Sequence, residues 1–237
     1  MASDRNNKQA RRQRRKQRDR ISRPATHDGA VLERLLAKVR PDMHEHYRMV
    51  YVDASRIRAA AESGKALFDD LNGYIDRTCG EWEQRSQPAC KAGCDWCCHQ
   101  DVLLAPFERD VVIGEMRRLN LQEKVEARLA EEQHFVWVPA AGKKMPISPC
   151  PFLEDHRCLI YDRRPIACRT QYSLDAEPCE RAVRSALASG GDVSYQRAVV
   201  PAATGVAARN AVDRKRRVSM REELRRALKE PASSREP

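Results

Sequence analysis

The sequence predicts a mainly α-helical protein with a central irregular, cysteine-rich region and one or two short strands. Apolar residues recur at spacings of three and four in the N-terminal and C-terminal parts of the chain, as they do along one face of a helix. Between these parts, prolines and closely spaced cysteines interrupt any regular pattern. Because only 5% of the residues are aromatic and 33% are charged, we expect a modest hydrophobic core.

The N-terminal part predicts two helical stretches. The first begins after a capping residue such as Asp28 and ends at Pro41. A longer stretch follows from 42 to 82, and Gly64 and Gly73 are the points at which it is expected to break.

The rest of the chain predicts shorter elements. Pro106 opens a helix, because proline is favoured in the first turn. The runs 135–138 and 158–161 are rich in aromatic or branched residues and are expected to be strands, with an irregular segment at 139–151 between them. Further helices are predicted at 121–133, 182–189, 193–212 and 220–228.

These elements divide the chain into a disordered basic arm (1–26), a helical segment (27–84), a cysteine-cluster metal-binding domain (85–180), C-terminal helices (181–230) and a disordered tail (231–237). The arm carries ten Lys or Arg residues against Asp4 and Asp19. It lacks periodic apolar positions, so it cannot bury enough surface to become ordered. Bases within residues 5–23 can bind nucleic-acid phosphates, but no aromatic residue is present to stack on bases. A solvated tail is therefore favoured over nucleic-acid binding.

The sequence favours a cytoplasmic protein without a membrane anchor. It contains no run of about 18 apolar residues, and no apolar stretch follows the charges at the N-terminus. In the reducing cytoplasm structural disulfides are disfavoured. The odd number of cysteines, nine, and the adjacency of Cys97 and Cys98 also fit a disulfide framework poorly.

The strongest chemical signal is the spacing of the cysteines. A first burst reads Cys90-Lys-Ala-Gly-Cys94-Asp-Trp-Cys97-Cys98, and a second burst lies about 50 residues further on. Thiolates are soft ligands that suit Zn²⁺ and iron–sulfur clusters, and Gly93 frees the backbone for the tight turn that ligation requires. We therefore predict a site for zinc or iron, with an iron–sulfur cluster as one form of the iron site. Its thiols are those of Cys90, Cys94, Cys97, Cys98, Cys150, Cys158, Cys168 and Cys179.

The surroundings of Cys168 support ligation. Pro165 is expected at the first position of a helix, which places Cys168 in the opening turn, where the helix dipole favours a thiolate. Three nearby arginines are expected either to hydrogen-bond the thiolates or to form a solvated charge group: Arg163, Arg164 and Arg169.

Other interpretations remain open for single residues. Cys94 and Cys97 have the two-residue spacer of a redox pair, although the strand that should precede such a pair is not predicted. Cys79 is expected to be an ordinary buried thiol. His99 and His156 can replace a thiolate as ligands or can be polar loop residues.

The arrangement resembles the bacterial cysteine-cluster family, also called the CxxCxxCC or zinc- or iron-chelating domain family. The residues that carry the resemblance lie within 88–170 and are Cys90, Cys94, Cys97, Cys98, Cys150-Pro-Phe-Leu153, Cys158-Leu-Ile-Tyr-Asp-Arg-Arg-Pro165 and Cys168-Arg169. The chain departs from the family pattern at Cys90, because three residues lie between Cys90 and Cys94 where the family pattern has two. The resemblance implies metal chelation. A flagellin lysine methylase is similar in its cysteine pattern, which implies that an iron–sulfur cluster is possible here.

Three functions follow from this reading. The first is a metal-binding protein that sequesters, delivers or senses zinc or iron. The second is an iron–sulfur enzyme that modifies a protein, although no glycine-rich nucleotide loop or Ser–His–Asp arrangement is recognisable. The third is a zinc-stabilised adaptor that binds nucleic acid through the basic arm.

Overall fold

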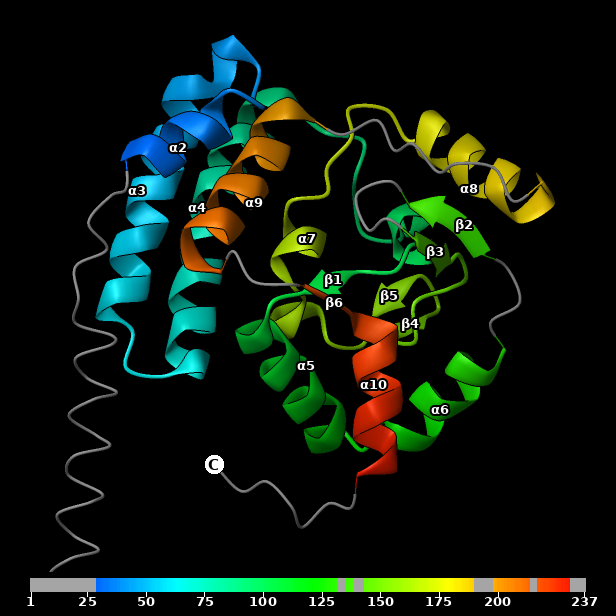
Figure 1. Ribbon diagram of the computed structural model, residues 1–237. Helices are drawn as coiled ribbons and strands as arrows, with labels where there is room; N and C mark the ends of the chain where they lie inside the picture. Colours follow the sequence, from blue (N-terminus) through cyan, green and yellow to red (C-terminus); the bar gives the residue numbers. More distant parts are fainter. Residues whose placement is uncertain (1–28, 132–134, 139–142, 190–197, 214–216, 231–237) are drawn as a thin grey trace, which may run out of the picture.

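The computed structural model describes residues 29–131, 135–138, 143–189, 198–213 and 217–230. Within these ranges the prediction of a mainly α-helical fold is confirmed, with nine α-helices and six strands of two to four residues (Figure 1). No helix in the same ranges is long and apolar enough to cross a membrane. The basic arm and the C-terminal tail lie outside the described residues, so their disorder stays a prediction, as do the segment boundaries given above.

One layer of the fold is a group of four helices from opposite ends of the chain. Its members are α2 (Gly29–Leu36), α3 (His44–Ala60), α4 (Gly64–Ser86) and α9 (Val199–Val212). In Figure 1, α9 runs alongside α3 and α4 although more than 100 residues separate it from them. Its small side chains Ala207 and Ala208 are completely buried, which lets α9 approach the other helices closely. They share a core with Tyr47, Val50, Leu71 and Ile75.

The predicted stretch 42–82 is two helices rather than one. A short turn, η1 (Pro41–Met43), precedes α3, and the chain breaks after Ala60. The Ser63 side chain then caps α4 by accepting a hydrogen bond from the backbone N–H of Ala66 at 3.1 Å. The break thus falls at Gly64 as expected, whereas α4 continues without interruption through Gly73.

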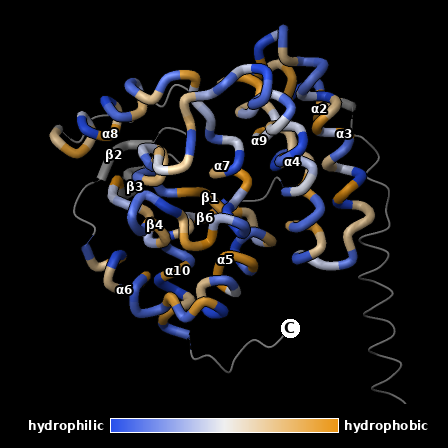
Figure 2. Tube along the Cα trace, turned by 180° about the vertical axis from the view of Figure 1, so that it is seen from behind, coloured by the Kyte–Doolittle hydropathy of each residue, from blue (hydrophilic) through white to orange (hydrophobic). Residues whose placement is uncertain are grey.

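A second core lies beneath the cysteine-rich segment. It is formed by α5 (Pro106–Arg118), α6 (Gln122–Ala130) and α10 (Met220–Lys229), with buried Val112, Met116 and Leu224 at its centre. Figure 2 shows hydrophobic residues gathered where β1, α5 and α10 meet. Phe152 and Ile160 join this core from the cysteine-rich segment, so the core anchors the segment that follows Cys150.

The strands form three antiparallel pairs. They are β1 (Leu103–Leu104) with β6 (Val218–Ser219), β2 (Phe135–Val138) with β3 (Lys143–Pro146), and β4 (Leu153–Glu154) with β5 (Arg157–Cys158). The strand predicted at 135–138 is present as β2. The segment predicted to be irregular contains β3, because β3 pairs with β2.

The prediction of a strand at 158–161 is wrong beyond Cys158. Asp155 and His156 adopt positive φ angles of 47° and 61° and close the β4–β5 hairpin, so β5 ends at Cys158. The chain then turns through η4 (Tyr161–Arg163).

Two further helices flank the cysteines. The first, α7 (Ile166–Arg169), is a single turn, and α8 (Glu177–Ser189) begins earlier than the predicted 182. Pro165 stands immediately before α7, at its N-cap, instead of in its first turn. Of the predicted helix 193–212, residues 193–197 lie outside the described residues and α9 begins at Val199.

Candidate metal centre

The first cysteine burst folds into a turn followed by one turn of 3₁₀-helix. Gly93 has φ +89°, a conformation that favours glycine, and the N–H of Cys94 closes this turn on the carbonyl of Lys91 at 2.9 Å. Cys97 and Cys98 then lie in η2 (Trp96–His99). The predicted tight turn at Gly93 is therefore present, and the local bend lets adjacent cysteines serve the same region.

Backbone hydrogen bonds join the second burst to the first. The N–H of Cys150 donates to the carbonyl of Cys98 at 2.7 Å, and the N–H of Ser148 donates to the carbonyl of His99 at 3.0 Å. A further bond of 2.8 Å links Leu153 to Cys150, and Leu153 pairs with Cys158 across the β4–β5 hairpin. The two stretches are thus held side by side, as the metal-site prediction requires.

Two other cysteines approach η2 from helices. Cys168 is the third residue of α7 and packs, together with Cys150 and Cys158, against the second core. Cys179 lies in α8, which contacts η2: the Arg184 guanidinium lies 5.4 Å from the centre of the Trp96 ring.

Cys90 is held by Ser173, which lies between α7 and α8. The Ser173 N–H donates to the Cys90 sulfur at 3.2 Å, and the Ala89 N–H donates to the Ser173 carbonyl at 3.0 Å. The Ser173 side chain also hydrogen-bonds Cys179. Eight of the nine cysteines therefore gather around η2 and the β4–β5 hairpin. The ninth, Cys79, is buried in α4 as predicted.

Backbone donors face the sulfur atoms in a repeated pattern. The N–H groups of Trp96, Phe152 and Ile160 hydrogen-bond the sulfurs of Cys94, Cys150 and Cys158, in each case two residues earlier in the chain. Such bonds stabilise negative charge on sulfur and orient a ligating side chain.

The surroundings of most of these thiols disfavour the thiolate form when no cation is bound. Burial raises the pKa of Cys90 to about 11 and that of Cys150 to about 12. Burial also raises the pKa of Cys168, and the negative charges that Cys150 and Cys97 would carry raise it further. Cys97 is the exception, because the Cys98 thiol hydrogen-bonds its sulfur and lowers its pKa. A bound cation would remove this mutual repulsion.

Of the three arginines that were considered as partners of the thiolates, Arg164 acts on the thiols. Burial raises the pKa values of Cys158 and Cys168, and the positive charge of Arg164 partly offsets this rise; the same charge contributes to the lowered pKa of Cys97. The Arg164 guanidinium stacks 3.8 Å from the centre of the Tyr161 ring. Among the described residues, its buried Nε atom has no hydrogen-bond partner.

The other two arginines connect the segment to α4. Arg163 pairs with Asp69, and Arg169 pairs with Asp76 at 2.5 Å. Arg169 is also bonded to the carbonyl of Asp162, so it braces the loop before α7. For Arg163 and Arg169 the expectation of contact with thiolates is therefore wrong, and neither forms a solvated charge group, because α4 supplies carboxylate partners.

The two histidines lie beside the thiols and contact the same residue. His156 Nδ1 lies 3.1 Å from a side-chain oxygen of Asp95, and the ring is mostly exposed. His99 Nδ1 lies 3.2 Å from the Asp95 carbonyl and its ring stacks on Trp96. The His156–Asp95 contact ties the hairpin turn to the first burst.

Residues 89–185 match the CxxCxxCC family, described as "Putative zinc- or iron-chelating domain". The predicted resemblance is thereby confirmed, over a segment that contains Cys179 as well. The CxxCxxCC segment runs from one residue before Cys90 into α8 and holds all eight clustered thiols. No curated protein and no solved structure matches the chain.

The donor set of the CxxCxxCC segment suits a soft metal in its chemistry. Its clustered side chains are thiols, several of them accept backbone N–H bonds, and Arg164 adds a positive charge that would offset excess thiolate charge. Within the described ranges, no three His, Cys, Asp or Glu side chains are grouped so that they could hold a metal ion. Side-chain rotation of the thiols is therefore needed for coordination.

A buried polar network joins the CxxCxxCC segment to α10, and the sequence did not predict this network. Arg221 at the start of α10 is completely buried and donates to the carbonyls of Ser148 and Pro149 at 2.7 and 3.2 Å. Its guanidinium lies 3.9 Å from the equally buried carboxylate of Asp101. Arg221 therefore holds the two residues that precede Cys150.

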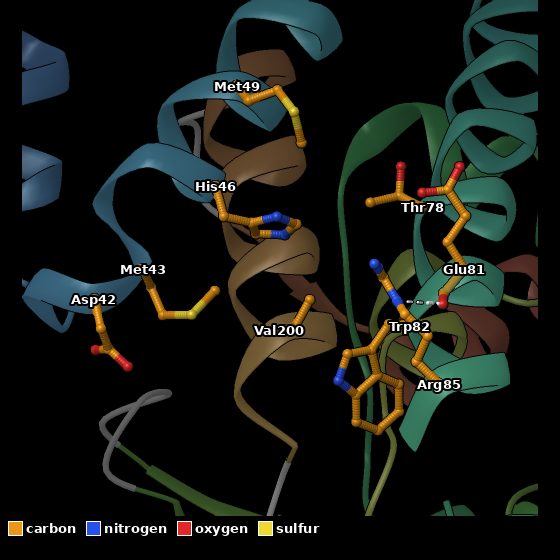
Figure 3. Close-up of a pocket in the computed structure, with 9 residues that line it drawn as sticks. All are labelled: Asp42, Met43, His46, Met49, Thr78, Glu81, Trp82, Arg85 and Val200. Atoms are coloured by element: carbon orange, nitrogen blue, oxygen red, sulfur yellow. Dashed lines mark hydrogen bonds between the residues drawn. The ribbon is translucent and has the colours of Figure 1, made fainter. Parts of the chain in front are cut away.

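A separate pocket of about 400 Å³ lies among the helices α3, α4 and α9 (Figure 3). His46 points into it from α3 and hydrogen-bonds Thr204 of α9 at 2.8 Å. Trp82 and Arg85 of α4 form the opposite wall, and Arg85 is bonded to the Glu81 carbonyl at 3.1 Å. No clustered cysteine lines this pocket, which distinguishes it from the thiol site.

Proposed function

We propose that the chain is a metal-binding protein that chelates zinc or iron through the clustered thiols of its CxxCxxCC segment. The proposed ligands are Cys90, Cys94, Cys97, Cys98, Cys150, Cys158, Cys168 and Cys179. The observation that carries the proposal is the backbone bond between Cys98 and Cys150, which joins cysteines from two remote stretches at one place.

The chemistry of the site supports a metal over free thiols. Thiols that are partly buried beside one another ionise reluctantly, yet the sulfurs of Cys90, Cys94, Cys150 and Cys158 accept backbone N–H bonds that favour the thiolate. A cation reconciles these two features, because it stabilises several thiolates together. A bound Zn²⁺ ion would supply structural crosslinking, whereas an iron–sulfur cluster would add electron transfer.

Sequestration, delivery or sensing of the metal is the role that we favour. Metal binding also joins the loop between the two bursts to the second core, so the occupancy of the site would be coupled to the stability of this part of the fold. Such coupling suits a sensor or carrier that is held in a reducing compartment such as the cytoplasm. The nucleic-acid alternative depends on residues 5–23, which lie outside the described residues, and it stays a prediction.

Elemental analysis of the full chain, purified without oxygen, tests the proposal. We expect zinc or iron to co-purify with the chain, and Cys150→Ser to lower the metal content. Cys79→Ala is the matched control, since it removes a thiol that is buried in the core of the four-helix layer and is not a proposed ligand, and it should retain the metal. A chain that holds neither metal after purification, and takes up neither Zn²⁺ nor iron with sulfide afterwards, would contradict the proposal.

A further inference from the structure

The eight clustered thiols fall into two groups that meet at one pair of neighbours. Cys97 and Cys98 are hydrogen-bonded to each other through their side chains. On either side of this pair, the remaining thiols are held by different parts of the fold.

The first group is arranged around Ser173. Cys90 and Cys179 both hydrogen-bond Ser173, although 89 positions of chain separate the two cysteines. The turn at Gly93 brings Cys94 back toward η2, and α8 places Cys179 over η2. Cys94 and Cys97 are also the thiols whose charges act on Cys179. We call this group the Ser173 set, and its members are Cys90, Cys94, Cys97 and Cys179.

The second group is arranged around the β4–β5 hairpin. The backbone bond from Cys150 to Cys98 places η2 at the start of the hairpin, and Cys158 ends its second strand. Cys168 packs against the same core as Cys150 and Cys158. The charges that act on Cys98 come from Cys97, Cys150 and Cys168. We call this group the hairpin set, and its members are Cys98, Cys150, Cys158 and Cys168.

We infer that the chain holds two metal centres, one in the Ser173 set and one in the hairpin set, with Cys97 and Cys98 at their boundary. Each centre would take one Zn²⁺ ion or one iron–sulfur cluster. Four thiolates saturate a tetrahedral zinc ion or supply the ligands of one cluster, so eight thiols exceed what one centre can use. This inference rests on the proposed function and specifies how its ligands are divided.

Titration of the metal-free, reduced full chain with Zn²⁺ tests the division. The parent chain should bind about two ions, and Cys94→Ser/Cys179→Ser and Cys158→Ser/Cys168→Ser should each bind about one. Cys79→Ala should still bind about two. If the parent binds one ion and both double variants bind none, a single shared centre is present and the inference fails, whereas the proposed function survives. If the parent binds no Zn²⁺ and forms no iron–sulfur cluster, both fail.

A measurement on the unmodified sequence covers the case in which a double variant does not fold. The parent chain is loaded with one equivalent of Zn²⁺, exposed thiols are alkylated, and the protected cysteines are located by mass spectrometry. Two separate centres predict that cysteines of one set are protected together, independently of the other set. Protection of Cys90 or Cys179 in the same molecules and to the same extent as Cys158 and Cys168 would overturn the division.

Discussion

The backbone N–H of Cys150 donates to the carbonyl of Cys98 at 2.7 Å, so a cysteine from each burst is fixed at one point without any metal contact. This bond aligns the two stretches, while the thiols themselves are not grouped to hold an ion in the described residues. Metal binding is therefore expected to tighten a site whose backbone is already assembled.

Metal removal should destabilise the CxxCxxCC segment more than the four-helix layer. In the proposed site the segment is held by ligands from remote positions, whereas α3, α4 and α9 share a hydrophobic core. Hydrogen exchange measured with and without a strong chelator should show faster exchange in 89–185 and little change at Val50 or Leu71. Equal exchange in both states would show that the metal does not stabilise this segment.

Substitution of Gly205 should disturb α7, which carries Cys168. A Cβ atom at Gly205 would lie 2.9 Å from the Cβ of Thr170, closer than packed side chains approach. We expect Gly205→Ala to cost about 1–3 kcal/mol in the free energy of unfolding, although alanine normally favours a helix. Chemical denaturation provides the measurement.

Gly114→Ala is the matched control for Gly205. Gly114 also lies inside a helix, α5, and apart from its chain neighbours and its own helix backbone a Cβ there meets no atom of the described residues within 4 Å. This variant should be as stable as the parent or about 1 kcal/mol more stable. If both variants behave alike, the close approach of Gly205 to Thr170 does not determine the packing of α7.

Loss of Arg221 should affect both stability and metal affinity. Arg221→Met would leave the buried Asp101 carboxylate without its cation and free the carbonyls of Ser148 and Pro149. Breaking such a buried pair costs about 3–5 kcal/mol, and loss of the support behind a ligand typically weakens metal binding about 10–100-fold. Chelator competition on samples shown to be folded by circular dichroism measures the second effect.

The comparison for Arg221 is an arginine on the surface. Arg118 in α5 is largely exposed and pairs with Glu115 on the same helix. Arg118→Met should leave both the melting temperature and the metal affinity nearly unchanged. Unaltered metal affinity in a folded Arg221→Met chain would show that Arg221 does not position the residues before Cys150.

The stability of the metal-free chain and that of the metal-loaded chain should change with pH in opposite directions. In the metal-free chain, burial raises the pKa of Cys90 to about 11 and of Cys150 to about 12, from an ordinary value of 9.0. These groups bind protons more tightly when folded, so their contribution to stability is complete below about pH 9 and is lost as the pH rises toward 11–12.

In the metal-loaded chain the same thiols are ionised, so protons compete with the metal and stability falls as the pH falls. Melting temperatures of both forms between pH 6 and about 10.5 check these opposite slopes. Parallel slopes for the two forms would contradict ligation by these thiols.

The sequence predicted the elements whose signals are local. The helices α5 and α10 follow from Pro106 and from the spacing of apolar residues at Met220–Leu228, and the turn at Gly93 follows from the need for a positive φ. The cysteine bursts were recognisable because their spacing is itself the signal, and the family match covers them.

Features that depend on long-range contacts were not predictable in this way. Nothing near Arg163 or Arg169 in the sequence indicates that Asp69 and Asp76 of α4 are their partners. Arg221 lies about 70 residues from the carbonyls that it holds, and its sequence neighbours resemble those of a surface helix. The hairpin turn at Asp155 and His156 was missed because neither residue is glycine.

The most direct test of the account is the metal content of the full chain, purified in the absence of oxygen and freed of loosely bound ions. We predict that zinc or iron remains bound, and that replacing the eight clustered cysteines by serine abolishes it while Cys79→Ala does not. A parent chain that retains no zinc or iron, and whose melting temperature is unaffected by adding either, would contradict the account.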